Sequence, residues 1–191
     1  MRYFQALYED SPARLILVNN ADYHCPYPAT DIQPLPGEDN PYPIGTIEHD
    51  GFQLAQVIRA LAPEGDLVLH GHSRGGAVVL EAGRQFPELM LDPDRQISAV
   101  LEAAVLPQAR AAGKGSDPLP HRIITYLLPI VLGLGRKAPV EKLLQQPMMK
   151  PTNPLKTEIC QSVYSNARHY ATCVTNVRSI RQWQMARSFD L

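Results

Sequence analysis

Cysteine is scarce in this chain, and its scarcity excludes two classes of protein. The sequence has three cysteines, Cys25, Cys160 and Cys173, and no CxxC pair. An odd number of cysteines without that spacing excludes a disulfide framework and a zinc site of the common type. The same usage favours a reducing compartment, so we expect a cytoplasmic protein.

Net charge and long hydrophobic runs are scarce as well. The formal net charge is −1 over 191 residues, which gives no electrostatic reason to expect a nucleic acid or an anionic membrane as a partner. The longest apolar stretch, residues 123–135, is interrupted by Pro129 and is too short to span a bilayer. Residues 1–15 mix charged and apolar residues and contain no secretory h-region.

Strand patterns and helix patterns alternate in the first half of the chain. The apolar run "RLILVNNA" at residues 14–21, closed by turn formers, predicts a buried parallel strand. Two further strands are expected at residues 65–71 and 97–107. Between the strands, the apolar spacing predicts a helix that includes residues 52–61 and another from about residue 75 to residue 86. This order predicts an α/β fold with a mostly parallel sheet.

The composition changes near residue 110. A polar connector, "QARAAGKGSDP", follows the third expected strand, and from residue 119 the chain has helical patterns broken by prolines. We therefore expect an α/β core segment over residues 1–110 and a helical lid or cap segment over residues 111–191.

The turn "GHSRGG" between the second expected strand and the next helix carries the strongest chemical signal. Gly71 and Gly75 flank Ser73 at the spacing of a nucleophile elbow, in which glycines permit a strained backbone and a close approach of strand and helix. The backbone N–H of Arg74 would then face a developing oxyanion at the helix N-terminus. A phosphate-binding turn is the alternative, but the Walker ending and the GxGxxG spacing are both missing.

With these landmarks the sequence resembles the α/β-hydrolase family over nearly its whole length. "GHSRGG" is similar to the family's elbow, and "LILVNNADY" to the strand that ends in an aspartate, here Asp22. "SAVLEAAVLP" is similar to the strand that leads into a lid, and "RHYATCVTNVRSIRQW" to a lid helix. The resemblance implies a mostly parallel sheet of the α/β-hydrolase type with a helical lid after the third visible strand.

The resemblance implies hydrolysis of a carboxylic ester or thioester through an acyl-enzyme on Ser73, with the Arg74 N–H as one oxyanion donor and with no metal or organic cofactor. A small-molecule ester or acyl compound would be the substrate. Two alternatives stay open. One is a C–C bond hydrolase or an acyltransferase on the same scaffold, and the other is a catalytically inactive module that binds a ligand or a partner.

The family's second oxyanion donor and its catalytic histidine have no counterpart here. We expect His72 to project away from the serine, His70 to pack in the core and His49 to lie on the surface, so none is assigned as the base. Without a base, turnover falls by about 10⁶. We therefore expect a chain that is incomplete at both ends and nearly inert alone. Glu102 is a candidate triad acid, although a plain polar residue at a strand end is the favoured interpretation.

The lid segment offers an apolar face that includes Leu127, Leu128 and Leu132. Above a catalytic serine, this face would favour an apolar acyl or aryl group and exclude water. Plain packing onto the sheet is an equal alternative, and the same two interpretations apply to Trp183.

Overall fold

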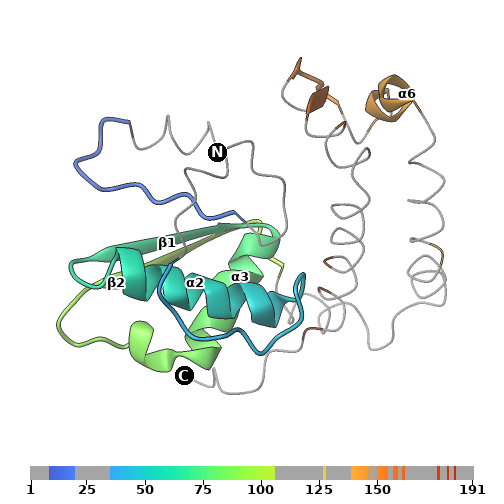
Figure 1. The fold of residues 1–191 in the computed structure, drawn as a ribbon. Coiled ribbons are helices and arrows are strands. Elements are labelled where there is room, and N and C mark those ends of the chain that lie inside the picture. The colour runs from blue at the N-terminus through green and yellow to red at the C-terminus, as the bar shows by residue number, and fades with distance from the viewer. Residues whose placement is uncertain are drawn as a thin grey trace, which may run out of the picture.

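The computed structural model describes two continuous stretches, residues 9–19 and 35–105. It also describes residues 127, 139–145, 147, 150–154, 157–158, 161, 176, 180 and 183. Along the chain the elements are α2 (Ile47–Leu61), β1 (Leu67–His72), α3 (Arg74–Gln85), the 3₁₀ helix η2 (Pro87–Leu89), β2 (Ile97–Glu102) and α6 (Val140–Leu144) (Figure 1).

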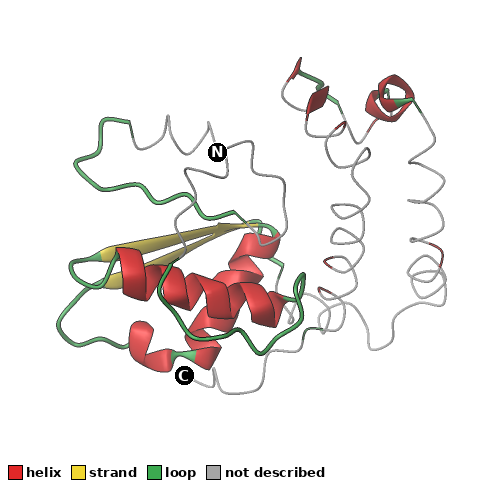
Figure 2. Cartoon of the chain, in the orientation of Figure 1, coloured by secondary structure: helices red, strands yellow, loops and turns green. Residues whose placement is uncertain are grey.

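The two strands lie parallel and in register (Figure 2). Leu67 is opposite Ile97 at one end of the ladder, and His72 is opposite Glu102 at the other. Because α3 connects these strands, the described part has the β–α–β order expected of an α/β protein. The sheet of the described residues has two strands, so the α/β character is confirmed, whereas the hydrolase type and the lid stay predictions.

Both ends of α2 are capped by specific contacts. At its start, the Thr46 hydroxyl oxygen accepts a hydrogen bond from the backbone N–H of His49 at 3.1 Å. This bond satisfies one of the donors that the first turn of a helix leaves free. At its end, Arg14 donates to the Leu61 carbonyl at 3.0 Å, and Arg95 donates to the Ala62 carbonyl at 3.0 Å. Two cations therefore lie at the negative end of the helix dipole.

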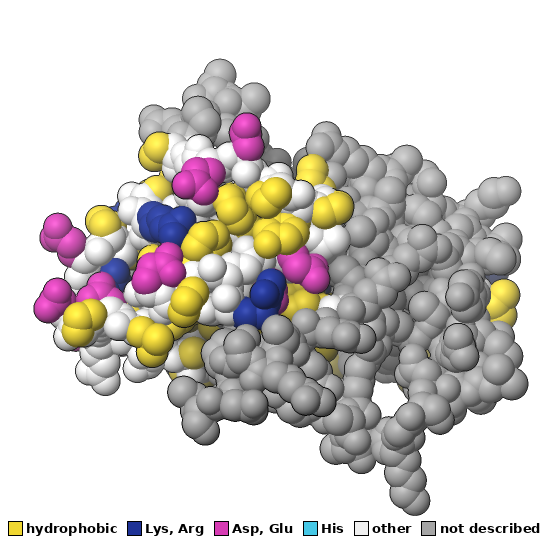
Figure 3. Space-filling view, turned by 90° about the horizontal axis from the view of Figure 1, so that it is seen from below, with side chains coloured by type: hydrophobic (Ala, Val, Ile, Leu, Met, Phe, Trp, Pro, Cys, Tyr) yellow, Lys and Arg dark blue, Asp and Glu magenta, His cyan; other side chains and the backbone are white. Residues whose placement is uncertain are grey.

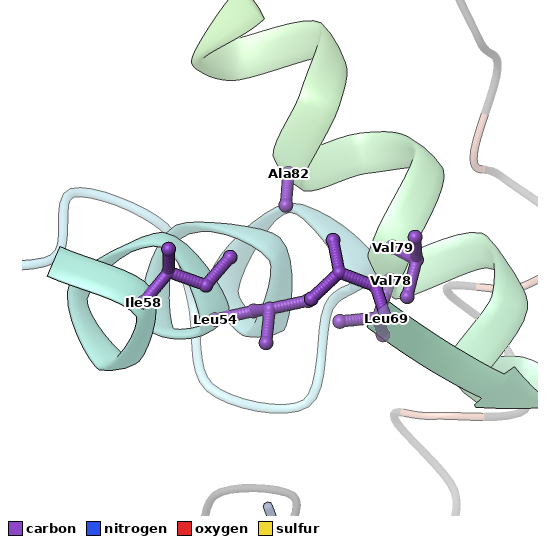
Figure 4. Close-up of a cluster of buried hydrophobic side chains, with 6 residues drawn as sticks. All are labelled: Leu54, Ile58, Leu69, Val78, Val79 and Ala82. Atoms are coloured by element: carbon purple, nitrogen blue, oxygen red, sulfur yellow. The ribbon is translucent and has the colours of Figure 1, made fainter. Parts of the chain in front are cut away.

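The main hydrophobic core lies where α2, α3 and β1 meet. Figure 4 shows α3 crossing α2 with their apolar side chains directed toward one another and toward Leu69 of β1. The cluster consists of Leu54, Ile58, Leu69, Val78, Val79 and Ala82. Gly51 permits the crossing, because a Cβ there would lie 2.9 Å from Glu81 Cγ and 3.1 Å from the Ala82 backbone nitrogen.

A second core cluster brings the C-terminal part of the chain to α3. Trp183 is 3% exposed and packs with Ile47 and Ala77. Of the two interpretations of Trp183, packing in the core is therefore the one that the structure supports.

The first expected strand is absent from the described residues. Residues 14–19 have no regular secondary structure, and Leu15, Leu17 and Val18 are 40%, 39% and 48% exposed. A strand needs a neighbour for its backbone hydrogen bonds, and within the described residues β1 pairs with β2 alone. The prediction of a buried strand is thus wrong for residues 14–19, while residues 20–21 lie outside the described part.

The third expected strand is shorter than predicted. β2 ends at Glu102 because Ala103 has a φ of 46°, a left-handed conformation that a strand cannot continue through. Most of the expected lid segment lies outside the described residues, and α6 is a short helix within its described part.

The surface of the described part mixes side-chain types. In the described part of the face drawn in Figure 3, acidic and basic side chains are interspersed among hydrophobic ones, so this part presents no field of a single sign. Among the described residues, no helix is both long enough and apolar enough to cross a membrane.

Candidate functional site

Ser73 lies at a sharp reversal between the end of β1 and the start of α3. Its backbone has φ 52° and ψ −119°, a combination that L-residues rarely adopt and that glycine tolerates. Holding a non-glycine residue there costs about 1–3 kcal/mol. Ser73 is exposed, and its side chain does not cap α3. The hydroxyl is therefore presented to solvent at the N-terminus of a helix.

Backbone hydrogen bonds from the neighbouring strand hold this reversal in place. The Ser73 N–H donates to the Glu102 carbonyl at 2.9 Å, and the Val105 N–H donates to the Ser73 carbonyl at 3.0 Å. The Gly76 N–H also donates to the Ser73 carbonyl, at 3.1 Å. Both peptide groups of Ser73 are thus fixed by the segment that ends β2, where Ala103 also has a positive φ.

The glycines of the turn have different steric roles. A Cβ on Gly71 would lie 2.6 Å from the Gly75 carbonyl oxygen, and a Cβ on Gly76 would lie 2.3 Å from Ala104 Cβ. A Cβ on Gly75 would meet nothing within 4 Å. The close approach of strand and helix therefore requires glycine at positions 71 and 76, whereas the motif glycine at 75 stands in open space.

Arg74 begins α3, and its side chain runs into the protein. It is 9% exposed, and its guanidinium donates to Asp50 Oδ2 through Nη1 at 2.5 Å and to the Gly45 carbonyl through Nη2 at 3.2 Å. Its backbone N–H belongs to the first turn, whose donors have no acceptor within the helix. The side chain anchors the residue, and its backbone N–H stays a predicted oxyanion donor.

His49 is part of the same buried network, contrary to the expectation that it lies on the surface. It is 5% exposed, and its Nδ1 lies 3.0 Å from Asp50 Oδ1. The expectation was wrong because the first turn of α2 packs inward, where Asn40 also donates to the His49 carbonyl at 3.0 Å. Sequence reasoning missed this network entirely, since Asp50 and Arg74 are 24 residues apart and share no motif.

Glu102 lies at the same sheet edge as Ser73, and its carboxylate is hydrogen-bonded to a histidine of the strand. Glu102 Oε2 is 3.1 Å from His70 Nε2, and the two side chains are 42% and 15% exposed. Because both residues lie on one face of the two-stranded ladder, this is a diagonal pair across the strands. The structure brings the Glu102 backbone to Ser73, while the carboxylate contacts His70.

No described histidine forms a hydrogen bond with the Ser73 hydroxyl. His49 is bonded to Asp50, His70 to Glu102, and His72 is exposed at the end of β1. His24, His121 and His169 lie outside the described residues.

The lid residues proposed to line a substrate pocket are placed only in part. Leu127 is helical and 46% exposed, and Leu128 and Leu132 lie outside the described residues. Within the described part of the chain, no group of three or more His, Cys, Asp or Glu side chains is arranged to hold a metal ion.

Further along α3, a second buried acid joins the helix to the C-terminal part of the chain. Glu81 is 0% exposed and accepts hydrogen bonds from Arg84, Gln85 and the Trp183 indole N–H. Burial alone would raise the pKa of Glu81, but these hydrogen bonds and the Arg84 charge outweigh burial and lower that pKa below its ordinary value. The same contact with Glu81 raises the pKa of Arg84, so both groups are charged at neutral pH.

Comparison of the chain with protein-family models, with curated proteins and with solved structures finds no match in any of the three. Membership of the α/β-hydrolase family therefore stays a prediction that rests on the residues and on the local geometry described above.

Proposed function

We propose that Ser73 is the nucleophile of a serine hydrolase that cleaves a carboxylic ester or thioester with an apolar acyl or aryl group. The observation that carries this proposal is the backbone of Ser73, with φ 52° and ψ −119°, on an exposed residue between a strand and a helix. Strain of this kind persists only where the surrounding structure holds it, and it is concentrated at functional sites. For a surface serine without a chemical role, this strained backbone would only lower the stability of the fold.

The chemistry follows from the position of the hydroxyl. A base takes the proton of the Ser73 hydroxyl as Oγ attacks the substrate carbonyl, and the protonated base passes it to the alcohol or thiol that leaves. Water then hydrolyses the acyl-enzyme, which releases the acid and restores the Ser73 hydroxyl. The Arg74 N–H and the N-terminus of α3 stabilise the negative charge that develops on the carbonyl oxygen. The reducing compartment favoured by the cysteines makes the cytoplasm the proposed location.

The base that deprotonates Ser73 has to come from outside the described contacts, because none of the described histidines forms a hydrogen bond with the hydroxyl: His49 is bonded to Asp50, His70 to Glu102, and His72 is exposed. His24, His121 and His169 are the histidines of this chain that are left to test. A histidine from another chain would complete the site in the same way.

The test is covalent labelling of the full chain with a fluorophosphonate, which reacts with activated serines. We expect one label, mapped by peptide mass spectrometry to Ser73, and none in Ser73→Ala. Alanine variants of His24, His121 and His169 then identify the base, because loss of the base lowers the rate by about 10⁶. Labelling of the native chain no faster than of the urea-unfolded chain would contradict the proposal.

A second candidate is an inactive hydrolase-like module that binds an acyl compound. The observation in its favour is that no described histidine hydrogen-bonds to Ser73. This module would bind short-chain esters in a calorimetric titration without turnover and without a label. If Ser73 is labelled, turnover assays with a panel of substrates distinguish the remaining alternatives. Esters and thioesters test the hydrolase, added acyl acceptors test an acyltransferase, and C–C substrates test a C–C bond hydrolase on the same scaffold.

A further inference from the structure

One carboxylate joins the first turn of α2 to the first residue of α3. Asp50 Oδ2 accepts from Arg74 Nη1, and Asp50 Oδ1 lies 3.0 Å from His49 Nδ1. The three residues are 5%, 9% and 5% exposed for Asp50, Arg74 and His49. A charged group buried to this degree is retained when its partners satisfy it, and both oxygens of Asp50 have a partner.

The residue that this carboxylate holds is the one that follows Ser73. Asp50 and the Gly45 carbonyl engage two different nitrogens of the Arg74 guanidinium, which fixes the direction of the side chain. Fixing the side chain restricts the Arg74 Cα, and with it the peptide between Ser73 and Arg74. That peptide carries the N–H to which we assign the oxyanion.

The strained turn is therefore held from two sides. On the side of the sheet, the Glu102 carbonyl and the Val105 N–H bind the peptide groups of Ser73. On the side of α2, Asp50 binds the side chain of Arg74. A rare backbone conformation relaxes unless the structure around it fixes it from more than one direction.

We infer that Asp50 is a positioning residue, which acts through Arg74 to hold the Ser73–Arg74 peptide in the geometry required for attack and oxyanion binding. This inference rests on the proposed role of Ser73. A buried ion pair adds little stability compared with apolar residues of the same volume. The hydrogen bonds from the Arg74 guanidinium to Asp50 and to the Gly45 carbonyl do fix geometry, which apolar packing does less well.

The first test compares Asp50→Asn with Glu81→Gln in the full chain. Asp50→Asn keeps the shape and one acceptor oxygen but removes the charge, and we expect fluorophosphonate labelling of Ser73 to slow at least tenfold, because misplacement of reacting groups by about 1 Å can cost 10²-fold. Glu81→Gln alters another buried acid, on α3, whose partners are Arg84, Gln85 and Trp183. It should leave the labelling rate within about twofold. Urea unfolding of both variants accounts for any fraction that is unfolded.

The second test does not depend on reactivity. Amide hydrogen exchange at Ser73 and Gly76 reports the bonds to the Glu102 and Ser73 carbonyls. In Asp50→Asn these two amides should exchange at least tenfold faster relative to amides in the middle of α3. Unchanged exchange at both amides overturns the positioning role, whether or not Ser73 is labelled. Absence of labelling in the native chain instead overturns the proposed function, and exchange alone then decides the role of Asp50.

If Asp50→Asn does not fold, Arg74→Lys replaces it. Lysine keeps the charge opposite Asp50 but lacks the fork that also reaches the Gly45 carbonyl. Faster exchange at Ser73 and Gly76 supports the inference, and exchange as in the native chain overturns it.

Discussion

Trp183 donates its indole N–H to Glu81 Oε2 over 2.8 Å, across 102 residues of chain. Glu81 is 0% exposed and Trp183 is 3% exposed, so the bond is shielded from water. The other oxygen of Glu81 accepts from Gln85 and Arg84. A residue near the C-terminal end thus completes the hydrogen bonding of a carboxylate on the helix that begins at Ser73.

Trp183→Phe tests the strength of this link. Phenylalanine keeps an aromatic ring in the cluster with Ile47 and Ala77 but removes the N–H donor, leaving Glu81 with fewer partners. We expect the free energy of unfolding to fall by about 1–3 kcal/mol, because a hydrogen bond to a charged group contributes roughly that much and Glu81 Oε2 keeps only the bond from Arg84 Nε. Far-UV circular dichroism in urea measures it, because the chain has one tryptophan and loses that fluorescence.

Leu91→Ala is the matched control, since Leu91 is 75% exposed and its truncation should change stability by less than about 0.5 kcal/mol. A Trp183→Phe variant as stable as this control would show that the indole bond does not stabilise the fold.

Glu81 also predicts a pH dependence of stability. The pKa of Glu81 is lowered in the folded state from its ordinary value of 4.5, because the bonds from Arg84, Gln85 and Trp183 outweigh burial. A depressed folded pKa gives stability that is present above pH 4.5 and is lost as the pH falls through the folded pKa. Relative to the native chain, Glu81→Gln should therefore be destabilised at pH 7, and the difference should shrink on acidification below pH 4.5.

Urea midpoints of the two proteins at a series of pH values measure this difference. Glu88→Gln serves as the comparison, since Glu88 forms an exposed pair with Arg59 and should give a small difference at every pH. A difference in urea midpoint between Glu81→Gln and the native chain that does not change with pH would rule out the lowered pKa of Glu81.

The elements around the site were predictable where the signal is local. The runs that became β1 and β2, and the helix between them, are bounded by Gly and Pro within a few residues of the pattern itself. Residues 14–19 show where local information fails. An apolar run forms a strand only if a neighbouring strand pairs with it through backbone hydrogen bonds. The sequence of the run does not show whether such a neighbour exists.

The candidate site was likewise predictable only where the signal is local. The spacing of Gly71 and Ser73 predicted a strained turn, because such a backbone needs specific residue types at fixed offsets. The Asp50–Arg74 pair was not predictable, since an acid in the first turn of a helix is explained by the helix dipole without any partner. Sequence periodicity places Asp50 at the start of α2, but only packing selects Arg74 as the residue that it binds.

The strain at Ser73 predicts that glycine is more stable there than serine. Ser73→Gly removes the steric cost of φ 52° and loses some stability through the entropy of the unfolded chain. The balance should stabilise the protein by up to about 2 kcal/mol relative to Ser73→Ala, which keeps the Cβ and the strain. Thermal or urea unfolding of the two variants measures this. Equal stabilities would mean that the backbone at residue 73 is not strained, which would remove the main support for the elbow.

Gly71 and Gly75 both belong to the elbow motif, but only at Gly71 does the packing of strand and helix require a glycine. Their alanine variants therefore form a matched comparison. In Gly71→Ala the new Cβ would lie 2.6 Å from the Gly75 carbonyl oxygen, so strand and helix must move apart, at a cost of about 1–3 kcal/mol or more. In Gly75→Ala the Cβ meets nothing within 4 Å. Alanine is also the better helix former, by up to about 1 kcal/mol, so this variant should be as stable as the native chain or slightly more stable.

Urea unfolding ranks the two variants, and fluorophosphonate labelling shows whether the turn still presents Ser73. We expect Gly75→Ala to fold and to label as the native chain does, and Gly71→Ala to lose stability and labelling together. If Gly75→Ala folds but is not labelled, the glycine at position 75 serves the approach of the substrate and not the packing of the helix. The open space beside Gly75 would then be the place where the acyl group passes over the start of α3.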